Sequence, residues 1–239
     1  MTFHVGTSGH SYPEWKGSFY PAKLPAKQML AFYATRFDTV EVNGTFYRAP
    51  TAAVVDGWAT QVPEAFRFAV KAPQEITHHR RLANVDEAVA SLLAVVQTLK
   101  KRLGPLLFQL PPNFKKDVPR LTAFLDLLKP RCQAAFEFRH ASWFDDEVFA
   151  LLRKHKAALC IADETDDLTV PFEATADWGY LRLRRTDYDD AALKLWADRM
   201  REQAWKDCFV YFKHEDTGTG PKLGAKLLEL LAEGSGETK

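Results

Sequence analysis

The sequence FEFRH at residues 136–140 closes a short apolar run. Successive side chains of a strand point to opposite faces, so Phe136 and Phe138 share one face. Glu137 and Arg139 share the other. In a barrel, this alternation places the aromatic rings against an outer layer of helices and the charged pair inside. Charges are costly to bury without a partner or a use. The stretch therefore predicts a barrel strand that carries ionisable groups into the interior at its carboxyl end.

Eight short strand-like segments of this kind run through the chain, and nearly every one ends on a polar or ionisable residue. Parallel strands expose their carboxyl ends on one face of a barrel, where residues far apart in the sequence share one pocket. We therefore expect the functional site at that face. The residues at the strand ends are Ser8, Glu41, Lys71, Gln109, Glu137, Asp163, Arg184 and Lys213.

Helical patterns alternate with these strands, which predicts parallel βαβ units and an α/β fold. About eight such units within 239 residues indicate a single TIM-type (β/α)8-like barrel domain over residues 1–239. Residues 164–177 have no helical period, so we expect one outer helix to be missing after strand six. The small, polar chain after about residue 233 is expected to fray. A doubly wound sheet would carry a GxGxxG turn after strand one, which Gly6-Thr7-Ser8-Gly9-His10 does not match.

The bulk composition limits the partners of the protein. Its 32 basic and 31 acidic residues give a net charge of +1, so no overall field draws it onto nucleic acid or anionic lipid. Cys132, Cys160 and Cys208 lie far apart without CxxC spacing, which favours free, buried thiols. No apolar stretch reaches the roughly 18 residues of a membrane span, and no signal-peptide pattern opens the chain. We expect a cytoplasmic protein with no membrane partner.

Three carboxylates are candidates for catalysis. Glu41 and Glu137 would face one cavity, and an environment that separates their pKa values would make one a general base and the other a general acid. Tight pairing with Lys71 or Arg139 would instead leave both ionised and structural. Asp163 is the third candidate, although aspartate is common in the turn after a strand. The residues alone leave these interpretations open.

Basic side chains occur at the same strand ends. Lys71 follows strand three, and Arg182 and Arg184 alternate with leucines on strand seven. Guanidinium groups bind planar carboxylates or phosphates through paired hydrogen bonds, and the turn Gly6-Thr7-Ser8-Gly9 offers backbone N–H groups. These features predict a mouth that binds an anionic substrate. The alternative is that the arginines only neutralise the carboxylates.

Aromatic and amide side chains complete the predicted mouth. Rings in loops on this face either pack into the core or form a wall on which a sugar ring or a nucleobase stacks. The rings concerned are Tyr12, Trp15, Phe46, Tyr47 and Trp143. Asn43 and Gln109 add uncharged polar groups at the ends of strands two and four.

The histidines form no metal motif, because none has a spacing such as HExxH. A divalent ion held by the strand-end carboxylates and His214 is conceivable, yet the basic side chains compete for the same carboxylates. The adjacent His78 and His79 are more typical of a solvated loop. We therefore predict no metal and no cofactor.

Long stretches rich in Trp, Tyr and Pro span almost the whole chain: VGTSGHSYPEWKGSFYP (5–21), FDTVEVNGTFYRAP (37–50), FAVKAPQEITHHRRL (68–82), LLFQLPPNF (106–114), FEFRHASWF (136–144) and YFKHEDTG (211–218). Together they closely resemble the YecE-like family, domain of unknown function number seventy-two. The resemblance implies a TIM-like barrel, loosely grouped with sugar-isomerase-type barrels and without an established reaction. It also implies a site lined by Thr7, Glu41, Asn43, Lys71, Gln109, Glu137, Arg139 and Asp163. Many members carry two asparagines where this chain has Lys213 and His214, which weakens a ligand role for strand eight.

The sequence thus favours a metal-independent enzyme of isomerase or lyase type that acts on a small anionic or sugar-like molecule. Glu137 is the expected base and Glu41 its partner. Lys71 or Arg139 would stabilise developing negative charge, while Arg184 and the glycine turn would hold the anion.

Two other functions fit the same residues. A nuclease or single-strand binder would use the aromatic loops and the basic stretch Thr77–Arg81, although the balanced net charge argues against it. A noncatalytic metabolite-binding protein would use the pocket without turnover.

Overall fold

The computed structural model describes residues 1–165, 167–214 and 216–233. Its strands form one parallel sheet in the order β1-β8-β7-β6-β5-β4-β3-β2. A bridge between Ser8 and Glu41 joins the two ends of this sheet, and the Gly9 N–H donates to the Glu41 carbonyl over 2.8 Å. The predicted α/β barrel is confirmed. The strands are β1 Thr2–Thr7, β2 Thr39–Val42, β3 Arg67–Lys71, β4 Leu103–Gln109, β5 Ala134–Glu137, β6 Ala158–Asp163, β7 Trp178–Leu183 and β8 Asp207–Phe212.

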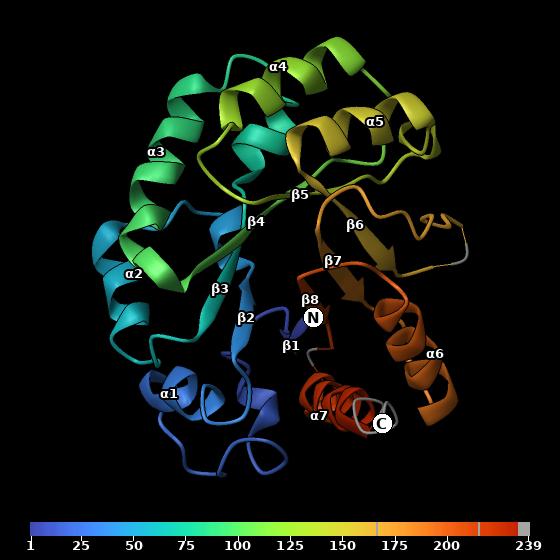
Figure 1. The fold of residues 1–239 in the computed structure, drawn as a ribbon. Helices are drawn as coiled ribbons and strands as arrows, with labels where there is room; N and C mark the ends of the chain where they lie inside the picture. Colours follow the sequence, from blue (N-terminus) through green and yellow to red (C-terminus); the bar gives the residue numbers. More distant parts are fainter. Residues whose placement is uncertain (166, 215, 234–239) are drawn as a thin grey trace.

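Helices surround the ring of strands (Figure 1). They are α1 Met29–Tyr33, α2 Ala52–Ala59, α3 Asp86–Val96, α4 Val118–Leu128, α5 Asp146–His155, α6 Asp190–Arg201 and α7 Thr219–Glu233. Between β6 and β7 the described residues contain no helix, so the expected gap in the outer layer is confirmed. The expected fraying after about residue 233 concerns residues 234–239, which lie outside the described residues.

Local sequence fixes where two of these helices begin. The Thr51 side chain accepts from the Val54 N–H over 3.4 Å, and Asp117 accepts from the Arg120 N–H over 3.1 Å. Such N-caps satisfy backbone donors that the first helical turn leaves without partners.

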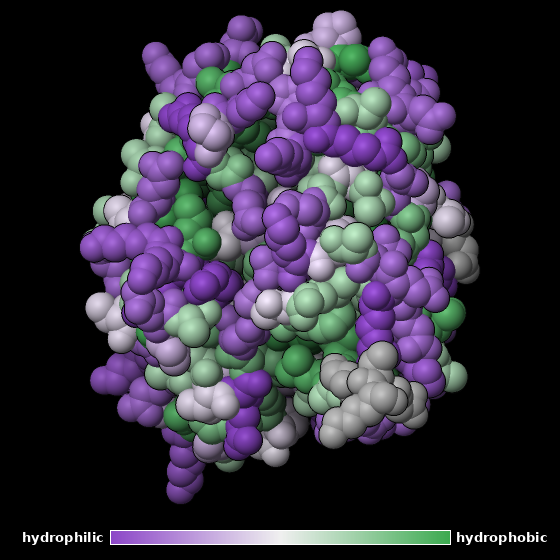
Figure 2. Space-filling view, in the orientation of Figure 1, coloured by the Kyte–Doolittle hydropathy of each residue, from purple (hydrophilic) through white to green (hydrophobic). Residues whose placement is uncertain are grey.

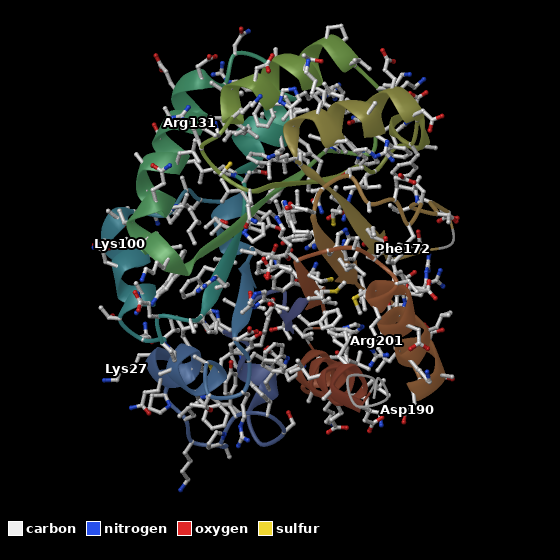
Figure 3. The ribbon with its side chains drawn as sticks, in the orientation of Figure 1. Lys27, Lys100, Arg131, Phe172, Asp190 and Arg201 are labelled. Atoms are coloured by element: carbon white, nitrogen blue, oxygen red, sulfur yellow. The ribbon has the colours of Figure 1, made fainter. Side chains whose placement is uncertain are left out.

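The barrel interior is packed with side chains rather than open, and Figure 3 shows them filling the ring. Inside it, Leu107, Tyr180, Phe209 and Tyr211 form an apolar and aromatic layer. Outside it, Phe136 meets Phe124 of α4 edge to face, with ring centroids 6.1 Å apart. The alternation of FEFRH therefore follows the prediction, with its phenylalanines against the helices.

Hydrophilic side chains cover much of the face in Figure 2, with smaller apolar patches between them. No helix in the described part of the chain is long and apolar enough to cross a membrane. All three cysteines are free; Cys160 and Cys208 are buried, while Cys132 is half-buried.

Candidate functional site

A buried ion cluster fills the barrel at the carboxyl ends of its strands. Arg182 from β7 donates through Nη2 to Glu41 Oε1 over 2.9 Å and through Nη1 to Glu137 Oε2 over 2.5 Å. Glu41 is 0% exposed, and Glu137 and Arg182 are each 1% exposed. One guanidinium group thus connects β2, β5 and β7, through one charge-assisted hydrogen bond to each of the two carboxylates.

Both carboxylate oxygens of Glu41 accept further hydrogen bonds. The Ser8 hydroxyl donates to Oε1 and the Tyr180 hydroxyl to Oε2, each over 2.6 Å. Burial alone would raise the pKa of Glu41, but Arg182 and the two hydroxyls outweigh burial and hold this pKa below its usual value. These neighbours therefore favour the ionised form of Glu41.

Both carboxylate oxygens of Glu137 also accept hydrogen bonds. Gln109 Nε2 and Arg139 Nε donate to its Oε1 over 2.8 and 2.9 Å, while Arg182 occupies Oε2. Burial would raise the pKa of Glu137, yet the charges of Arg182, Arg139 and Arg184 hold it well below its usual value. Both oxygens accept hydrogen bonds, so this carboxylate is poorly placed to take up a proton.

A cavity of about 530 Å³ lies at the barrel mouth, next to this cluster. Among the described residues, the charged side chains that line it are all basic: Lys71, Arg139, Arg182, Arg184 and Lys213. Its remaining lining residues are Tyr12, Asn43, Gly44, Phe46, Tyr47, Gln74, His78 and Gln109. Many of these residues are ones that the sequence placed at the barrel mouth, and the described lining is positively charged.

Lys71 is a pocket residue whose pKa is shifted toward neutral pH. Its Nζ lies 4.0 Å from the centroid of the Phe46 ring. Burial and the neighbouring Arg182 lower the pKa of Lys71 to about 8, against the opposing pull of Glu137 and Glu41. A lysine with this pKa exists in both protonation states under physiological conditions.

Three buried polar atoms at the pocket lack a hydrogen-bond partner among the described residues: Asn43 Nδ2, Asn43 Oδ1 and Arg182 Nε. Buried polar groups in folded proteins are nearly always satisfied. Because both residues line the cavity, these atoms provide two donors and one acceptor for a bound molecule.

For two of the rings the structure favours the core alternative, because Trp15 and Trp143 are fully buried. Trp143 stacks on Phe138 with ring centroids 4.7 Å apart, and its Nε1 donates to the Phe114 carbonyl over 2.6 Å. Packing both ring faces removes more apolar surface from water than an open wall would.

Tyr12 and Tyr47 do line the cavity, as predicted. Tyr47 is 77% exposed and lies at the rim, so it is accessible to a ligand.

The turn after β1 does not offer the predicted anion-binding amides. The N–H groups of Thr7, Ser8 and Gly9 all donate within the protein, over 2.8 to 2.9 Å. The side chains of Thr7 and Ser8 are buried, with 1% and 2% exposure. Gly6 is required by close packing instead, since a Cβ there would lie 2.2 Å from the Thr39 carbonyl oxygen.

Asp163 does not join the other two carboxylates. It accepts from Arg185 Nε over 2.7 Å and from the Tyr188 hydroxyl over 2.6 Å, and it does not line the cavity. On β6, Cys160 belongs to the inner layer and Ile161 to the outer core, so Asp163 shares the outward parity of Ile161. Its predicted place in the pocket is wrong.

Sequence reasoning missed Gln74 and His78, both of which line the pocket. They lie four residues apart at the short π-helix Glu75–His79, which follows β3. Burial and the nearby Lys71 lower the pKa of His78 to about 4, so it is neutral at pH 7. Spacing by four in a segment at the mouth is a signal that could have found this pair.

The two residues that follow strand eight, Lys213 and His214, differ in whether they line the pocket. Lys213 lines the pocket, whereas His214 is 6% exposed and its Nε2 bonds the Arg185 carbonyl. Among the described residues, no group of three or more His, Cys, Asp or Glu side chains could hold a metal ion.

Comparison with known proteins identifies relatives of this sequence. The sequence matches the family "Protein of unknown function DUF72" over residues 4–238. It is similar to the UPF0759 protein YecE of Escherichia coli (strain K12), with 33% identity over 142 residues, 59% of this chain and 50% of YecE. The matched segment thus spans about half the length of that relative. The UPF0759 protein YunF of Bacillus subtilis (strain 168) is 27% identical over 258 residues, which cover 90% of each chain.

Solved structures agree with the fold. A DUF72 family protein of Thermotoga maritima superposes with a TM-score of 0.84 and 26% identity, covering 97% of this chain and 100% of that one. Another from Enterococcus faecalis superposes with a TM-score of 0.80 and 19% identity, covering 97% and 96%. The latter similarity concerns the fold alone.

Proposed function

The chain belongs to the DUF72 family of proteins of unknown function, and we propose that it is an enzyme for acid–base chemistry on a small anionic, sugar-like substrate. One observation carries the proposal: within the described part of the chain, the charged side chains lining the cavity of about 530 Å³ are all basic. The two carboxylates beside it are already paired with Arg182. A small acid therefore gains electrostatic stabilisation there that a neutral molecule does not.

Lys71, rather than Glu137, is the residue we assign to proton transfer. Both oxygens of Glu137 accept hydrogen bonds, and its pKa is held low. Lys71 has a pKa of about 8 and can take up or release a proton near neutral pH. Arg139 and Arg184 would stabilise negative charge that develops on the substrate. This arrangement suits proton abstraction beside a carboxylate or carbonyl group, as in isomerases and lyases.

Asn43 would orient the substrate. Its amide presents a donor and an acceptor without partners among the described residues, which suits a hydroxyl group that both donates and accepts. Hydroxy acids and sugar acids carry an anionic group and hydroxyls together. These compounds are the substrate class to test first.

A ligand screen followed by a turnover assay tests the proposal. Sugar acids, hydroxy acids and sugar phosphates, each with its neutral analogue, would be scored by thermal stabilisation. Compounds that bind would then be incubated with the protein in D₂O and followed by NMR for deuterium uptake and product. We expect Lys71→Met to keep binding but to lose about 10²-fold or more in turnover.

Lys27→Met is the matched control, because Lys27 is exposed and labelled on the outside of the molecule in Figure 3. It should retain wild-type turnover. If every tight ligand stayed chemically unchanged with the wild-type protein, the enzyme assignment would fail in favour of a metabolite-binding protein.

The nucleic-acid alternative has less support from the described contacts. In the basic stretch Thr77–Arg81, His79 and Arg80 both pair with Glu75, over 3.0 and 2.7 Å. Strong retention on single-stranded DNA that fell steeply with salt would restore this alternative.

A further inference from the structure

Glu164, the first residue after β6, binds two arginines of the pocket at once. Its Oε2 accepts from Arg184 Nη1 over 2.6 Å and from Arg139 Nη2 over 3.2 Å. Arg139 follows β5 and Arg184 follows β7, and these strands lie on either side of β6. The two guanidinium groups therefore approach the carboxylate of Glu164 from opposite sides of its own strand. Glu164 lines a smaller cavity of about 210 Å³ that shares Arg139 with the basic cavity, so the protein places one of its own carboxylates beside the basic cavity.

This contact is weak enough to be exchanged. The side chain of Glu164 is 38% exposed, and those of Arg139 and Arg184 are 28% and 12% exposed. Ion pairs in contact with water contribute little net stability. Both bonds also end on the same oxygen, whereas a carboxylate bound through both oxygens has the stronger, bidentate geometry.

Contacts other than those with Glu164 restrict both arginines, through a side-chain hydrogen bond for Arg139 and through burial for Arg184. Arg139 is fixed through its Nε, which donates to the buried Glu137 over 2.9 Å. For Arg184, the backbone N–H donates to the Asp163 carbonyl over 2.8 Å, and packing restricts the side chain, which is only 12% exposed. A site whose donors are held by other contacts loses little order when its occupant changes.

We propose that Arg139 and Arg184 form a carboxylate subsite in which Glu164 is an internal ligand, replaced by the carboxylate of the substrate. The inference rests on the proposed function, since it requires an anion in this pocket, and it narrows the substrate class to carboxylic acids. On binding, the Glu164 side chain turns into the solvent that it already meets. Glu164 thereby selects for ligands that bind both arginines better than it does.

Calorimetric titration of glycolate, gluconate and inorganic phosphate, at constant ionic strength, tests the subsite. Glu164→Gln should bind the carboxylates about fivefold more tightly than the wild-type protein, because a weak internal competitor is removed. Glu164→Asp should also tighten binding, since it keeps the charge but has one methylene less with which to reach both arginines. Sorbitol, the neutral analogue of gluconate, should show no such gain.

Asp163→Asn is the matched control. It removes the same charge one residue away, but its carboxylate bonds Arg185 and Tyr188 instead of the pocket arginines. This variant should bind carboxylates with wild-type affinity. Equal tightening in both variants would mean a general charge effect and would overturn the subsite.

The outcomes also separate this inference from the proposed function. Binding to the wild-type protein that Glu164→Gln leaves unchanged would refute the subsite alone. A gain for phosphate but not for carboxylates would refute the carboxylate assignment. Absence of anion binding in every variant would refute both.

Discussion

Two ion clusters lie a few residues apart in this barrel and behave as opposites. The inner cluster, Glu41, Glu137 and Arg182, is at most 1% exposed. The rim cluster, Glu164, Arg139 and Arg184, is 12 to 38% exposed. Both consist of carboxylates and guanidinium groups, so the difference between them is their access to water.

Water changes the role of such a cluster. In the buried cluster each charge has lost its hydration, so removing one partner leaves another charge uncompensated. At the rim, water replaces a lost partner at little cost. We infer that the inner cluster maintains the shape of the barrel mouth and that the rim cluster is free to exchange partners with a ligand.

The largest expected effect comes from Arg182→Met. It would leave Glu41 and Glu137 buried without their shared cation and should lower the free energy of unfolding by about 3–5 kcal/mol. Urea denaturation measures this change. Arg184→Met, two residues along the same chain segment, is the control and should cost less than about 1 kcal/mol. Similar losses for the two variants would remove the distinction between the clusters.

Acid should weaken the inner cluster next. The pKa values of Glu41 and Glu137 are lowered in the folded protein from the usual 4.5. The stability they contribute is therefore complete above about pH 4.5 and is lost as the pH falls through their folded pKa values. The urea concentration at the unfolding midpoint, measured from pH 7 to pH 3, should decrease once the pH is below about 4.5. This decrease should be less steep for Glu137→Gln than for the wild-type protein.

Glu75→Gln provides the control for this profile. Glu75 also has a lowered pKa through its hydrogen bonds from Arg80 and His79, but it lies in solvent at the surface. Its replacement should leave the acid limb close to that of the wild-type protein. An acid limb that responds to Glu75 and not to Glu137 would contradict the assignment.

Lys71 is half-buried at the barrel mouth and offers a chemical test. Its pKa of about 8, against a usual 10.5, makes it the more reactive amine at pH 8. Brief acetylation with mass spectrometry should show Lys71 labelling that rises through about pH 8. Lys71 labelling that rises only near pH 10 would exclude a lowered pKa for this residue.

The sequence predicted the inner cluster better than the rim. The alternation in FEFRH identifies Glu137 and Arg139 as inward, and the fold class follows from repeated strand and helix patterns. The ALCIAD segment of β6 has no such alternation, because a strand buried on both faces is apolar on both. The sequence therefore could not show whether the Asp163 side chain points into the barrel or toward the outer layer.

The other features that the sequence did not reveal depend on contacts between residues far apart in the chain. Trp15 and Trp143 fit a core or a pocket wall equally well by type, and only packing decides between them. The lowered pKa of Lys71 depends on burial and on Arg182 from a distant strand. Glu164 has partners on two other strands, which no local pattern reveals.

The smallest effect on stability is expected at the rim, where Arg184→Gln should change the free energy of unfolding by less than about 0.5 kcal/mol. Its effect on carboxylate affinity should nevertheless be a loss of about tenfold, since one of the two guanidinium donors disappears. Urea denaturation and calorimetry on the same preparation measure both quantities. A rim residue that matters for binding and hardly for folding is what an exchangeable cluster requires. A large stability loss without any change in affinity would instead make the rim a second structural cluster, no different in role from the one beneath it.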